Sequence, residues 1–278
     1  MTAASQWSAS FAGASLDAMR VYDEVFVPRL FAPWAKKLLD AVEVAGGQAL
    51  IDVACGPGSV ARLAAERIGA QGHVTACDLS PAMLAIAKSK PAIAGAAPIE
   101  YVECPADLLR APTASYDVAT CQQGLQFFPD RGAALAEMRR VIRPGGQLGL
   151  AVWCALEDSP WWAALASALH DTLGERIAAE YRSGPWGLTD SAQLSALLER
   201  AGFRDVHVSV HRLPVVFEGG ADQVLSTLAA SGVAAQVAAA NEDTRGALAR
   251  RAEQKLAPLT GDGEVRSHTT SHIATAAA

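Results

Sequence analysis

Hydrophobic positions in the first half of this chain follow two alternating patterns. Short apolar runs such as Ala49–Val53 stop at a glycine, an acid or a turn, which is typical of buried parallel strands. Between these runs, apolar residues recur every three or four positions, as at Val60, Leu63 and Ala64, which indicates helices. The pattern predicts strands over residues 49–53, 73–77, 99–104, 116–121 and 147–153.

Local signals mark the ends of the helices between these strands. Gly69 ends the first helix, and Ser80-Pro81 supplies an N-cap and a favoured first residue for a helix over 81–90. Pro144-Gly145-Gly146 ends a further helix over 131–143. Strands that alternate with helices of this length predict right-handed βαβ units, and therefore an α/β fold with a doubly wound parallel sheet.

The second half of the chain departs from this alternation. Residues 155–189 are rich in tryptophan and tyrosine, and an amphipathic helix over 190–200 closes at Gly202. Strands are then expected over 206–217 and 265–275, with two helices, 221–240 and 242–256, between them.

Composition and charge narrow the functional classes. The chain has 278 residues, 51% of them hydrophobic and 19% charged, as in a globular protein. Its net charge of −6 argues against nucleic acid or an anionic membrane surface as partner, because both need clustered lysine and arginine. No apolar run approaches the roughly 20 residues that cross a bilayer, and residues 1–15 do not resemble a signal peptide, so we expect a cytoplasmic protein.

The stretch DVACGPGSVA carries the strongest chemical signal. Gly56-x-Gly58-x-x-Ala61 follows the first strand, and Asp78 ends the second, where its carboxylate can accept hydrogen bonds from both hydroxyls of a ribose. Nicotinamide cofactors and S-adenosylmethionine share that ribose contact. Asp52, however, would repel a pyrophosphate, whereas it suits the ammonium and sulfonium of S-adenosylmethionine. The alternative is a buried Asp52 that only caps the turn.

Other polar clusters give weaker signals. The five cysteines lie at or near the carboxyl ends of the five strands and form no C-x-x-C motif, so they indicate neither disulfides nor zinc. We interpret the cluster of Arg139, Arg140 and Arg143 as a solvated helix face. We expect no metal, because two histidine pairs lie too far apart along their strands to share an ion: His207 with His211, and His268 with His272.

Four segments together resemble the class I S-adenosylmethionine-dependent methyltransferases, in their small-molecule, ubiquinone/menaquinone-type branch. They are LIDVACGPGSVARLA, VTACDLSPAMLAIA, SYDVATCQQGLQFFPDRGAALAEMRRVIRPGGQLGLAVW and LLERAGFRDVHV. The resemblance implies a Rossmann-like sheet of seven strands in the order 3-2-1-4-5-7-6. Its last strand is antiparallel, so residues 206–217 and 265–275 form a closing hairpin.

The resemblance also implies roles in binding S-adenosylmethionine and its product S-adenosylhomocysteine. The glycines let the methionine part approach the backbone, Asp78 holds the ribose, and Leu79 and Met83 flank the adenine. Gln122 lines the sulfonium, and Tyr22 sits on an N-terminal helix that covers the cofactor. The expected contacts are Tyr22, Asp52, Ala54, Gly56, Gly58, Asp78, Leu79, Met83, Pro105, Ala106, Asp107 and Gln122.

One position departs from the family pattern. After the third strand the family usually has Gly-Asp-Ala, whose Asp contacts the adenine amino group, but this chain reads Cys104-Pro105-Ala106. The backbone N–H of Ala106 can still reach the adenine, and Asp107 is the conjectured replacement for the amino contact. The loss of one charged hydrogen bond weakens binding by roughly 1.5–3 kcal/mol.

The methyl acceptor is expected to be a small, flat and largely apolar metabolite, methylated on O, N or C. In-line transfer from a sulfonium mainly requires proximity and exclusion of water, and His170 is only a weak candidate for a general base. Aromatic walls with a few amides suit such an acceptor. The expected wall consists of Gln123, Gln126, Phe127, Phe128, Trp161, Trp162, Tyr181 and Trp186.

These features suggest four segments: an N-terminal helical cap (1–40), a cofactor-binding core (41–154), a lid insertion (155–189) and the rest of the core (190–278), with a helical insertion at 221–258. A homodimer is compatible with them. Two alternatives stay open: a methyltransferase-like scaffold that binds the cofactor without transferring methyl, and a nicotinamide-dependent oxidoreductase.

Overall fold

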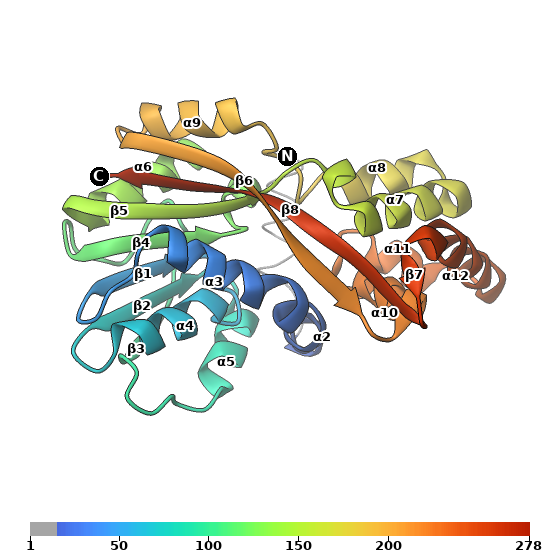
Figure 1. Cartoon of the computed structure of the whole chain (residues 1–278), viewed down its shortest axis with the longest axis horizontal. Helices are drawn as coiled ribbons and strands as arrows, with labels where there is room; N and C mark the ends of the chain where they lie inside the picture. Colours follow the sequence, from blue (N-terminus) through green and yellow to red (C-terminus); the bar gives the residue numbers. More distant parts are fainter. Residues whose placement is uncertain (1–15) are drawn as a thin grey trace.

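The computed structural model describes residues 16–278 (Figure 1). Its centre is an eight-stranded sheet in the order β3-β2-β1-β4-β5-β8-β6, and a short strand, β7, pairs with β8. Strands β1 to β5 are parallel, whereas β8 is antiparallel to its neighbours β5 and β6. The strands are β1 (Ala49–Val53), β2 (His73–Asp78), β3 (Ile99–Glu103), β4 (Tyr116–Gln122), β5 (Ile142–Trp153), β6 (Arg204–Phe217), β7 (Thr260–Gly261) and β8 (Glu264–Ala277).

The predicted fold class and strand order are confirmed. The expected seventh strand is β8, because the two-residue strand β7 precedes it in the chain. The expectation that residues 1–15 form no signal peptide, and the first part of the expected N-terminal cap, lie outside the described residues. Among residues 16–278, no helix combines the length and the apolar character that crossing a bilayer requires.

Helices cover both faces of the sheet and bury two separate cores. Side chains alternate along a strand, so Leu50 joins the core on one face and its neighbour Ile51 joins the core on the other. The first face is covered by α3 (Ala32–Ala41), α4 (Ser59–Ile68) and α5 (Pro81–Ser89). The opposite face is covered by α6 (Arg131–Val141) and α9 (Ser191–Arg200).

The N-terminal helix α2 (Leu16–Phe26) lies against α5 at the edge of the molecule. It packs there through a small cluster of Met19, Met83 and Ile86, separate from the two main cores. A π-helical turn, η1 (Val27–Phe31), joins α2 to α3. Lys90 donates hydrogen bonds to the Asp23 carboxylate (2.7 Å) and to the carbonyl of Pro57 (2.8 Å), and so ties α2 to the loop after β1.

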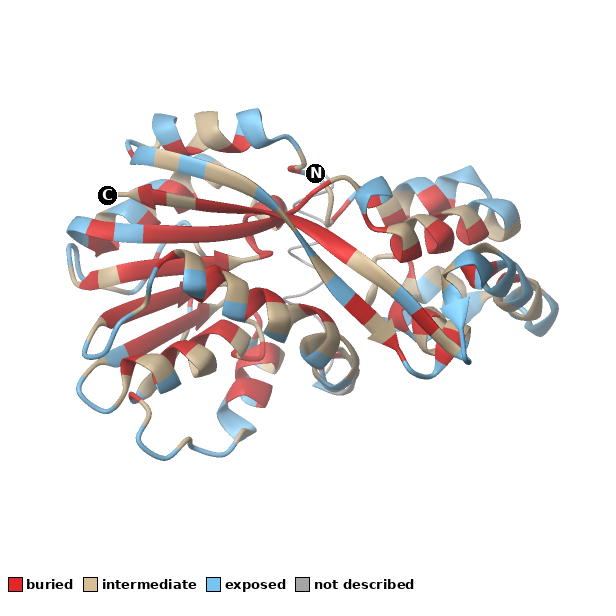
Figure 2. Ribbon diagram, in the orientation of Figure 1, coloured by how far each residue is buried: buried red, intermediate tan, exposed pale blue. Residues whose placement is uncertain are grey.

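A lobe of helices is attached to strands β6 and β8, which extend beyond the part of the sheet that pairs with β5. β5 pairs with β8 only from Ser271 onward, so the first half of β8 leaves the core paired with β6 and β7 (Figures 1 and 2). The lobe contains η3 (Leu156–Asp158), α7 (Pro160–Leu173), α8 (Glu175–Arg182), α10 (Gly220–Ser226), η4 (Thr227–Ala230), α11 (Ala234–Ala239), α12 (Glu242–Leu256) and η5 (Ala257–Leu259).

Two helix predictions need correction. The single helix expected over 221–240 is wrong, because the chain there forms α10, η4 and α11. The helix is interrupted at Ser231, where the backbone is extended and the side-chain hydroxyl donates to the carbonyl of Leu228. The helix expected over 131–143 ends at Val141, because β5 begins at Ile142 and includes the Pro-Gly-Gly turn.

The three arginines do more than form a solvated face: Arg139 and Arg143 are exposed as expected, but each of the three also makes specific contacts. Arg139 donates to the carbonyl of Gly202 at 2.9 Å. Arg143 pairs with the Asp117 carboxylate at 2.7 Å. Arg140, described below, binds the loop between β3 and β4. Arg139 and Arg140 therefore fix α6 to two neighbouring loops, and Arg143 links the start of β5 to β4.

Candidate functional site

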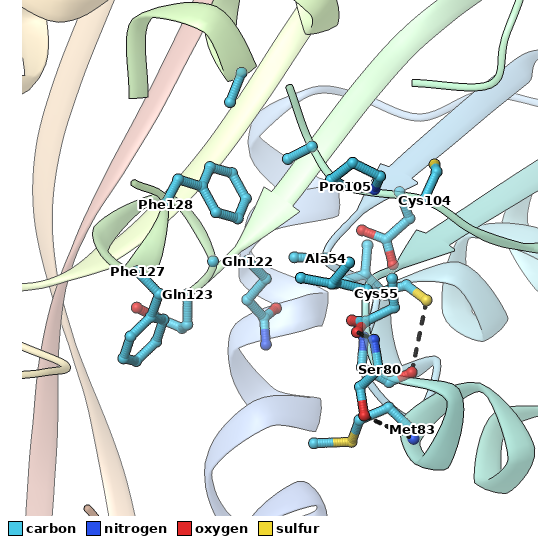
Figure 3. Close-up of a pocket in the computed structure, with 18 of the residues that line it drawn as sticks. Ala54, Cys55, Ser80, Met83, Cys104, Pro105, Gln122, Gln123, Phe127 and Phe128 are labelled. Atoms are coloured by element: carbon cyan, nitrogen blue, oxygen red, sulfur yellow. Dashed lines mark hydrogen bonds between the residues drawn. The ribbon is translucent and has the colours of Figure 1, made fainter. Parts of the chain in front are cut away.

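A cavity of about 250 Å³, which we call the first chamber, opens at the carboxyl ends of β1, β2, β3 and β4 (Figure 3). Doubly wound sheets bind their ligands at this edge. Every residue expected to contact the cofactor lines the first chamber except Gly58. Phe31, Ser59 and Gly124 complete parts of its wall that the sequence did not indicate.

The loop after β1 reverses direction within a few residues. Ala54, Gly56 and Gly58 all have positive φ angles, of 58°, 54° and 85°. No atom lies within 4 Å of the point where a Cβ on Gly56 would be, so this part of the loop faces free space. A Cβ on Gly58 would instead touch the hydroxyl of Tyr101 at 3.4 Å. Gly58 therefore shapes the turn, whereas Gly56 leaves room for a ligand to approach the backbone.

Asp52 is buried beneath this loop. Its carboxylate accepts hydrogen bonds from the Thr120 hydroxyl (2.8 Å) and from the backbone N–H of Ala61 (3.1 Å). Burial raises the pKa of Asp52 to about 7, although both hydrogen bonds act to lower it. Asp52 therefore caps the turn and also presents a titrating carboxylate to the first chamber.

Asp78 holds the loops after β1 and β2 together. One carboxylate oxygen accepts from the N–H of Gly56 and the other from the N–H of Ser80, both at 2.8 Å. Burial raises the pKa of Asp78, and the hydrogen bonds from the backbone oppose that shift. Each oxygen keeps a further lone pair for a ligand hydroxyl.

The opposite wall comes from the loops after β2 and β3. Ser80 caps α5 through a 3.4 Å hydrogen bond from the N–H of Met83. Leu79 is 46% exposed at the rim, and Asp107 is exposed beside it, while Pro105 and Ala106 line the interior. The conjectured replacement for the missing family Asp thus lies at the solvent edge of the first chamber.

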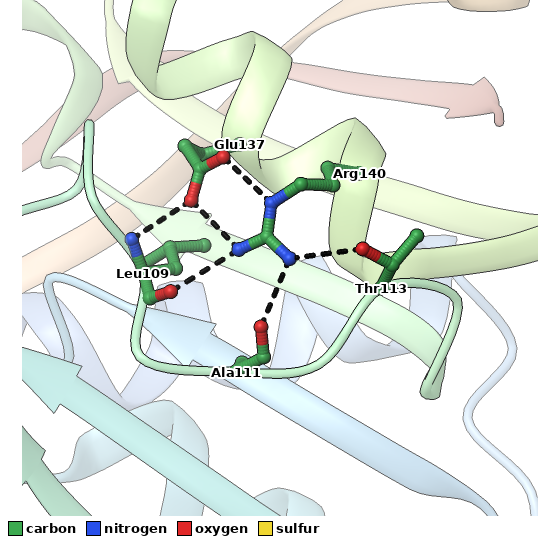
Figure 4. Close-up of polar contacts among 5 residues, drawn as sticks. All are labelled: Leu109, Ala111, Thr113, Glu137 and Arg140. Atoms are coloured by element: carbon green, nitrogen blue, oxygen red, sulfur yellow. Dashed lines mark hydrogen bonds and ion pairs between the residues drawn. The ribbon is translucent and has the colours of Figure 1, made fainter.

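The loop between β3 and β4 is fixed from behind by two side chains of α6 (Figure 4). Glu137 accepts a hydrogen bond from the N–H of Leu109 at 3.0 Å and pairs with Arg140 at 2.7 Å. Arg140 in turn donates to the carbonyls of Leu109 and Ala111 and to the hydroxyl of Thr113. This network positions the segment that contains Pro105 to Asp107.

Two glutamines follow β4. Gln122 donates to the carbonyl of Phe31 at 2.9 Å, while its Oε1 is buried without a hydrogen-bond partner. Gln123 has a positive φ of 54° and donates to the Ser271 hydroxyl at 3.0 Å. Its Oε1 accepts from Gln126, which is buried behind it. Strained backbone at Ala54 and Gln123, on facing loops, is typical of functional sites.

A second, smaller cavity of about 80 Å³, which we call the second chamber, adjoins the first. The two share Tyr22, Phe31, Gln123 and Phe127. The remaining wall of the second chamber comes from the N-terminal helices, the end of β5 and the helical lobe. It consists of Phe26, Leu30, Trp153, Trp162, Tyr181, Pro185, Trp186, Thr227, Ala230 and Ser231.

The residues expected to bind the acceptor fall into three groups: those that line the second chamber, those that line only the first, and those that line neither. Gln123, Phe127, Trp162, Tyr181 and Trp186 line the second chamber. Phe128 lines the first chamber only. Gln126 and Trp161 line neither, because both are fully buried: Gln126 behind Gln123, and Trp161 against Phe217 at a ring distance of 4.9 Å.

His170 lies away from both chambers. It is half exposed on α7, where Nδ1 is 3.2 Å from Asp171 and Nε2 is 3.5 Å from Glu175. No histidine lines either chamber, so no histidine is placed as a general base. Residues 16–278 also contain no group of side chains suited to a metal ion. All five cysteines are buried and unpaired, and Cys55 and Cys104 line the first chamber.

Some wall residues were missed for identifiable reasons. Trp153 ends the fifth strand, and the rule that ligands lie at carboxyl ends of strands was sufficient to find it. Thr227 and Ser231 carried no such signal, because they reach the second chamber from a lobe inserted between β6 and β8. Phe26 and Phe31 were missed because their positions depend on how α2 folds back over the sheet.

Comparison with known proteins decides between the cofactor classes. Residues 17–217 match the sequence profile of the ubiE/COQ5 methyltransferase family. The chain belongs to the ubiE/COQ5 methyltransferase family. It is therefore an S-adenosylmethionine-dependent methyltransferase, which leaves no support for the nicotinamide alternative.

Related family members are bacterial enzymes of moderate similarity. A demethylmenaquinone methyltransferase of Listeria monocytogenes is 31% identical over 194 residues, which cover 66% of this chain and 81% of the relative. A ubiquinone/menaquinone biosynthesis C-methyltransferase of Xanthomonas campestris pv. campestris is 36% identical over 115 residues, covering 41% of this chain and 46% of the relative.

Solved methyltransferase structures share the fold of this family member. A phosphoethanolamine N-methyltransferase of Haemonchus contortus, bound to phosphomonomethylethanolamine and S-adenosylhomocysteine, has a TM-score of 0.60 at 18% identity, covering 97% of this chain and 59% of that chain. A SAM-dependent methyltransferase of Aquifex aeolicus has a TM-score of 0.52 at 20% identity, with 73% and 93% coverage. At these identities the likeness concerns the fold alone.

Proposed function

We propose that this enzyme methylates a small, flat and largely apolar metabolite that binds in the second chamber, with S-adenosylmethionine in the first. The observation that carries this proposal is the shared wall of the two chambers. A ligand in each would meet at Tyr22, Phe31, Gln123 and Phe127, so the two reactants can come into contact without crossing solvent.

The first chamber fits S-adenosylmethionine in charge and in shape. The buried carboxylate of Asp52, the half-buried carboxylate of Asp78 and the unpartnered Oε1 of Gln122 offer negative or acceptor atoms to a cation and to ribose hydroxyls. Gly56 leaves free space where a side chain would otherwise project. When bound, the cofactor supplies an electrophilic methyl group on a positively charged sulfur.

The second chamber is walled by a continuous series of aromatic rings. Tyr22 stacks on Phe31 at 5.1 Å, Phe31 lies 6.3 Å from Trp153, and Trp153 meets Trp162 edge-on at 4.9 Å. The series continues through Trp186, 5.3 Å from Trp162, to Tyr181 at 5.7 Å. Flat apolar molecules pack well against such walls. The names of the relatives, which refer to menaquinone and ubiquinone, agree with a ring-shaped acceptor.

The protein's contribution to in-line transfer is then placement and exclusion of water. Holding the acceptor atom against the methyl group converts a bimolecular step into one within a complex, which accounts for a large part of the barrier reduction. Helix α2 covers both chambers through Tyr22 and, for the second, Phe26. Among the described residues that line the second chamber there is no histidine, aspartate, glutamate or lysine, so we expect acceptors that react without a protein base, such as carbon nucleophiles of electron-rich rings or phenols that ionise readily.

The test is formation of S-adenosylhomocysteine with a panel of phenols, quinols and heteroaromatics, compared with aliphatic amines and alcohols of similar size. Turnover restricted to the flat ring compounds, and reduced by Trp162→Ala, supports the proposal. Turnover restricted to aliphatic acceptors contradicts it. Tight binding of S-adenosylmethionine with no turnover for either group would favour the scaffold alternative.

A further inference from the structure

The polar atoms that line the second chamber differ in whether they already have partners. Gln123 is engaged through both ends of its amide, to Ser271 and Gln126. The hydroxyl of Thr227 donates to the carbonyl of Val224 at 2.5 Å, and that of Ser231 donates to Leu228 at 2.7 Å. The hydroxyl hydrogens of Thr227 and Ser231 are already used, so neither has a donor left for an oxygen of a ligand, and the amide of Gln123 is held at both ends.

Two donors in the part of the second chamber that it does not share with the first are different. The indole Nε1 of Trp186 is buried and has no hydrogen-bond partner. Tyr181 is buried on α8, and burial alone raises the pKa of its hydroxyl, with no contribution from a neighbouring charge or hydrogen bond. Its hydroxyl thus stays protonated as a donor. The two rings lie 5.7 Å apart, and neither lines the first chamber.

A buried N–H without a partner is costly unless a ligand supplies one. Leaving a buried donor unsatisfied destabilises a protein, so such groups usually have an explanation. Trp161 has the same defect in its indole, but it lies outside the chamber against Phe217. Of these two indoles, only that of Trp186 lies in the wall of the second chamber, where a bound molecule can reach it.

The charge of the second chamber limits the kind of molecule that fits. No lysine, arginine, histidine, aspartate or glutamate is among the described residues that line it. A carboxylate or an ammonium on the ligand would lose its hydration there without a compensating charge, which is strongly unfavourable. A neutral oxygen with lone pairs is instead a good partner for two neutral donors.

From these contacts we infer that Tyr181 and Trp186 determine acceptor specificity by donating hydrogen bonds to a neutral ring oxygen, a carbonyl or a hydroxyl, on the end of the acceptor remote from the methyl donor. This inference rests on the proposed function, since it assumes that the acceptor occupies the second chamber. It narrows the acceptor class to uncharged, oxygen-bearing aromatic compounds and assigns the recognition to two side chains. Both residues act by positioning and take no part in bond formation.

The experiment uses the full chain saturated with S-adenosylhomocysteine and three probes of matched size: naphthol, methylnaphthalene and naphthoate. Equilibrium dialysis gives the affinity of each probe for the wild type, Tyr181→Phe and Trp186→Phe. Each neutral hydrogen bond contributes about fivefold in affinity. We therefore expect naphthol to bind at least about fivefold more tightly than methylnaphthalene, with naphthoate weakest. Each variant should lose a large part of that preference while its affinity for methylnaphthalene changes less than about twofold.

Trp161→Phe is the matched control. It removes the neighbouring unpartnered indole N–H but leaves the lining of the second chamber unchanged, so the preference for naphthol should persist. Equal binding of naphthol and methylnaphthalene by the wild type overturns the inference and leaves the proposed function standing. A preference that survives in both Tyr181→Phe and Trp186→Phe overturns it as well. Failure of every probe to bind contradicts the proposed function itself.

Discussion

Asp52 should make cofactor binding depend on pH. Its pKa is raised to about 7 by burial, so about half of the free protein carries this proton at pH 7. A cationic cofactor favours the ionised carboxylate, and binding therefore lowers the pKa. Binding of S-adenosylmethionine at pH 7 should release about half a proton from Asp52.

The size of this pH effect on cofactor affinity follows from the populations of the two protonation states of Asp52. If only the ionised form binds, the apparent Kd increases by a factor of about two at pH 7 and about eleven at pH 6. Affinity should thus fall about fivefold as the pH decreases from 7 to 6. The α-amino group of the cofactor, with a pKa near 7.7–8.0, stays protonated over this range and adds little. No histidine lines the first chamber, but Cys104 does, and its hydrogen bond with Cys77 lowers the pKa of its thiol, so Cys104→Ser is the control for a contribution from a thiolate.

The assay is calorimetric titration in two buffers with different ionisation enthalpies, at pH 6 and pH 7, on the wild type and Asp52→Asn. The variant keeps an oxygen that accepts from the Thr120 hydroxyl but cannot titrate. It should bind more weakly at pH 7, release no proton and show almost no change in Kd between the two pH values. Asp107→Asn, at the exposed rim, is the control and should retain the wild-type pH dependence.

Proton release that persists in Asp52→Asn would refute this reasoning, because the titrating group would then be another carboxylate, such as Asp78. A wild-type affinity that is independent of pH would do the same. It would mean that the hydrogen bonds from Thr120 and Ala61 keep Asp52 ionised at pH 6 in spite of its burial.

Three further changes test the supports of the first chamber. Gly124→Ala would place a Cβ 2.8 Å from both Ala54 Cβ and Cys121 Sγ, so it should cost roughly 1–3 kcal/mol in thermal unfolding. Gly132→Ala on α6, whose Cβ would meet only Asp130 Oδ1 at an ordinary contact distance of 3.4 Å, should not destabilise. Arg140→Met should lower the melting temperature and weaken cofactor binding severalfold in calorimetry. Arg140→Lys should not restore binding, because lysine lacks the planar guanidinium fork. An unchanged cofactor Kd would show that the contacts of Arg140 do not support the cofactor site. Lys90→Met should free α2 and speed release of S-adenosylhomocysteine severalfold in stopped-flow measurements, while Lys36→Met, which breaks an exposed pair within α3, should leave that rate unchanged.

The part of the fold that repeats locally was predictable from the sequence. β1 is buried throughout, is apolar except at Asp52 and ends before a glycine loop, and Ser80-Pro81 marks a helix start that the structure reproduces. These signals lie within a few residues of the feature that they predict. The same holds for Asp52 and Asp78, each of which ends up at the carboxyl edge of the sheet because its strand does.

The parts that depend on distant segments were not predictable in this way. Trp161 and Trp162 are adjacent and chemically identical, yet only Trp162 lines the second chamber, because α7 turns the two rings toward different neighbours. Arg140 resembles any exposed helical arginine until the β3–β4 loop is placed against it. Neither distinction is encoded in residues nearby in the chain.

The pairing of Phe217 with Val265 has a consequence for how this enzyme can be altered. The two residues are neighbours across β6 and β8, so the segment between them leaves and re-enters the molecule at nearly one point. The profile of the family ends at residue 217, just where this segment begins, and the segment supplies Thr227, Ala230 and Ser231 to the second chamber. Residues 218–264 therefore form an inserted segment whose two ends lie side by side. Grafting a different helical segment between those anchor positions should redirect the enzyme to new acceptors while the donor half of the reaction is left intact.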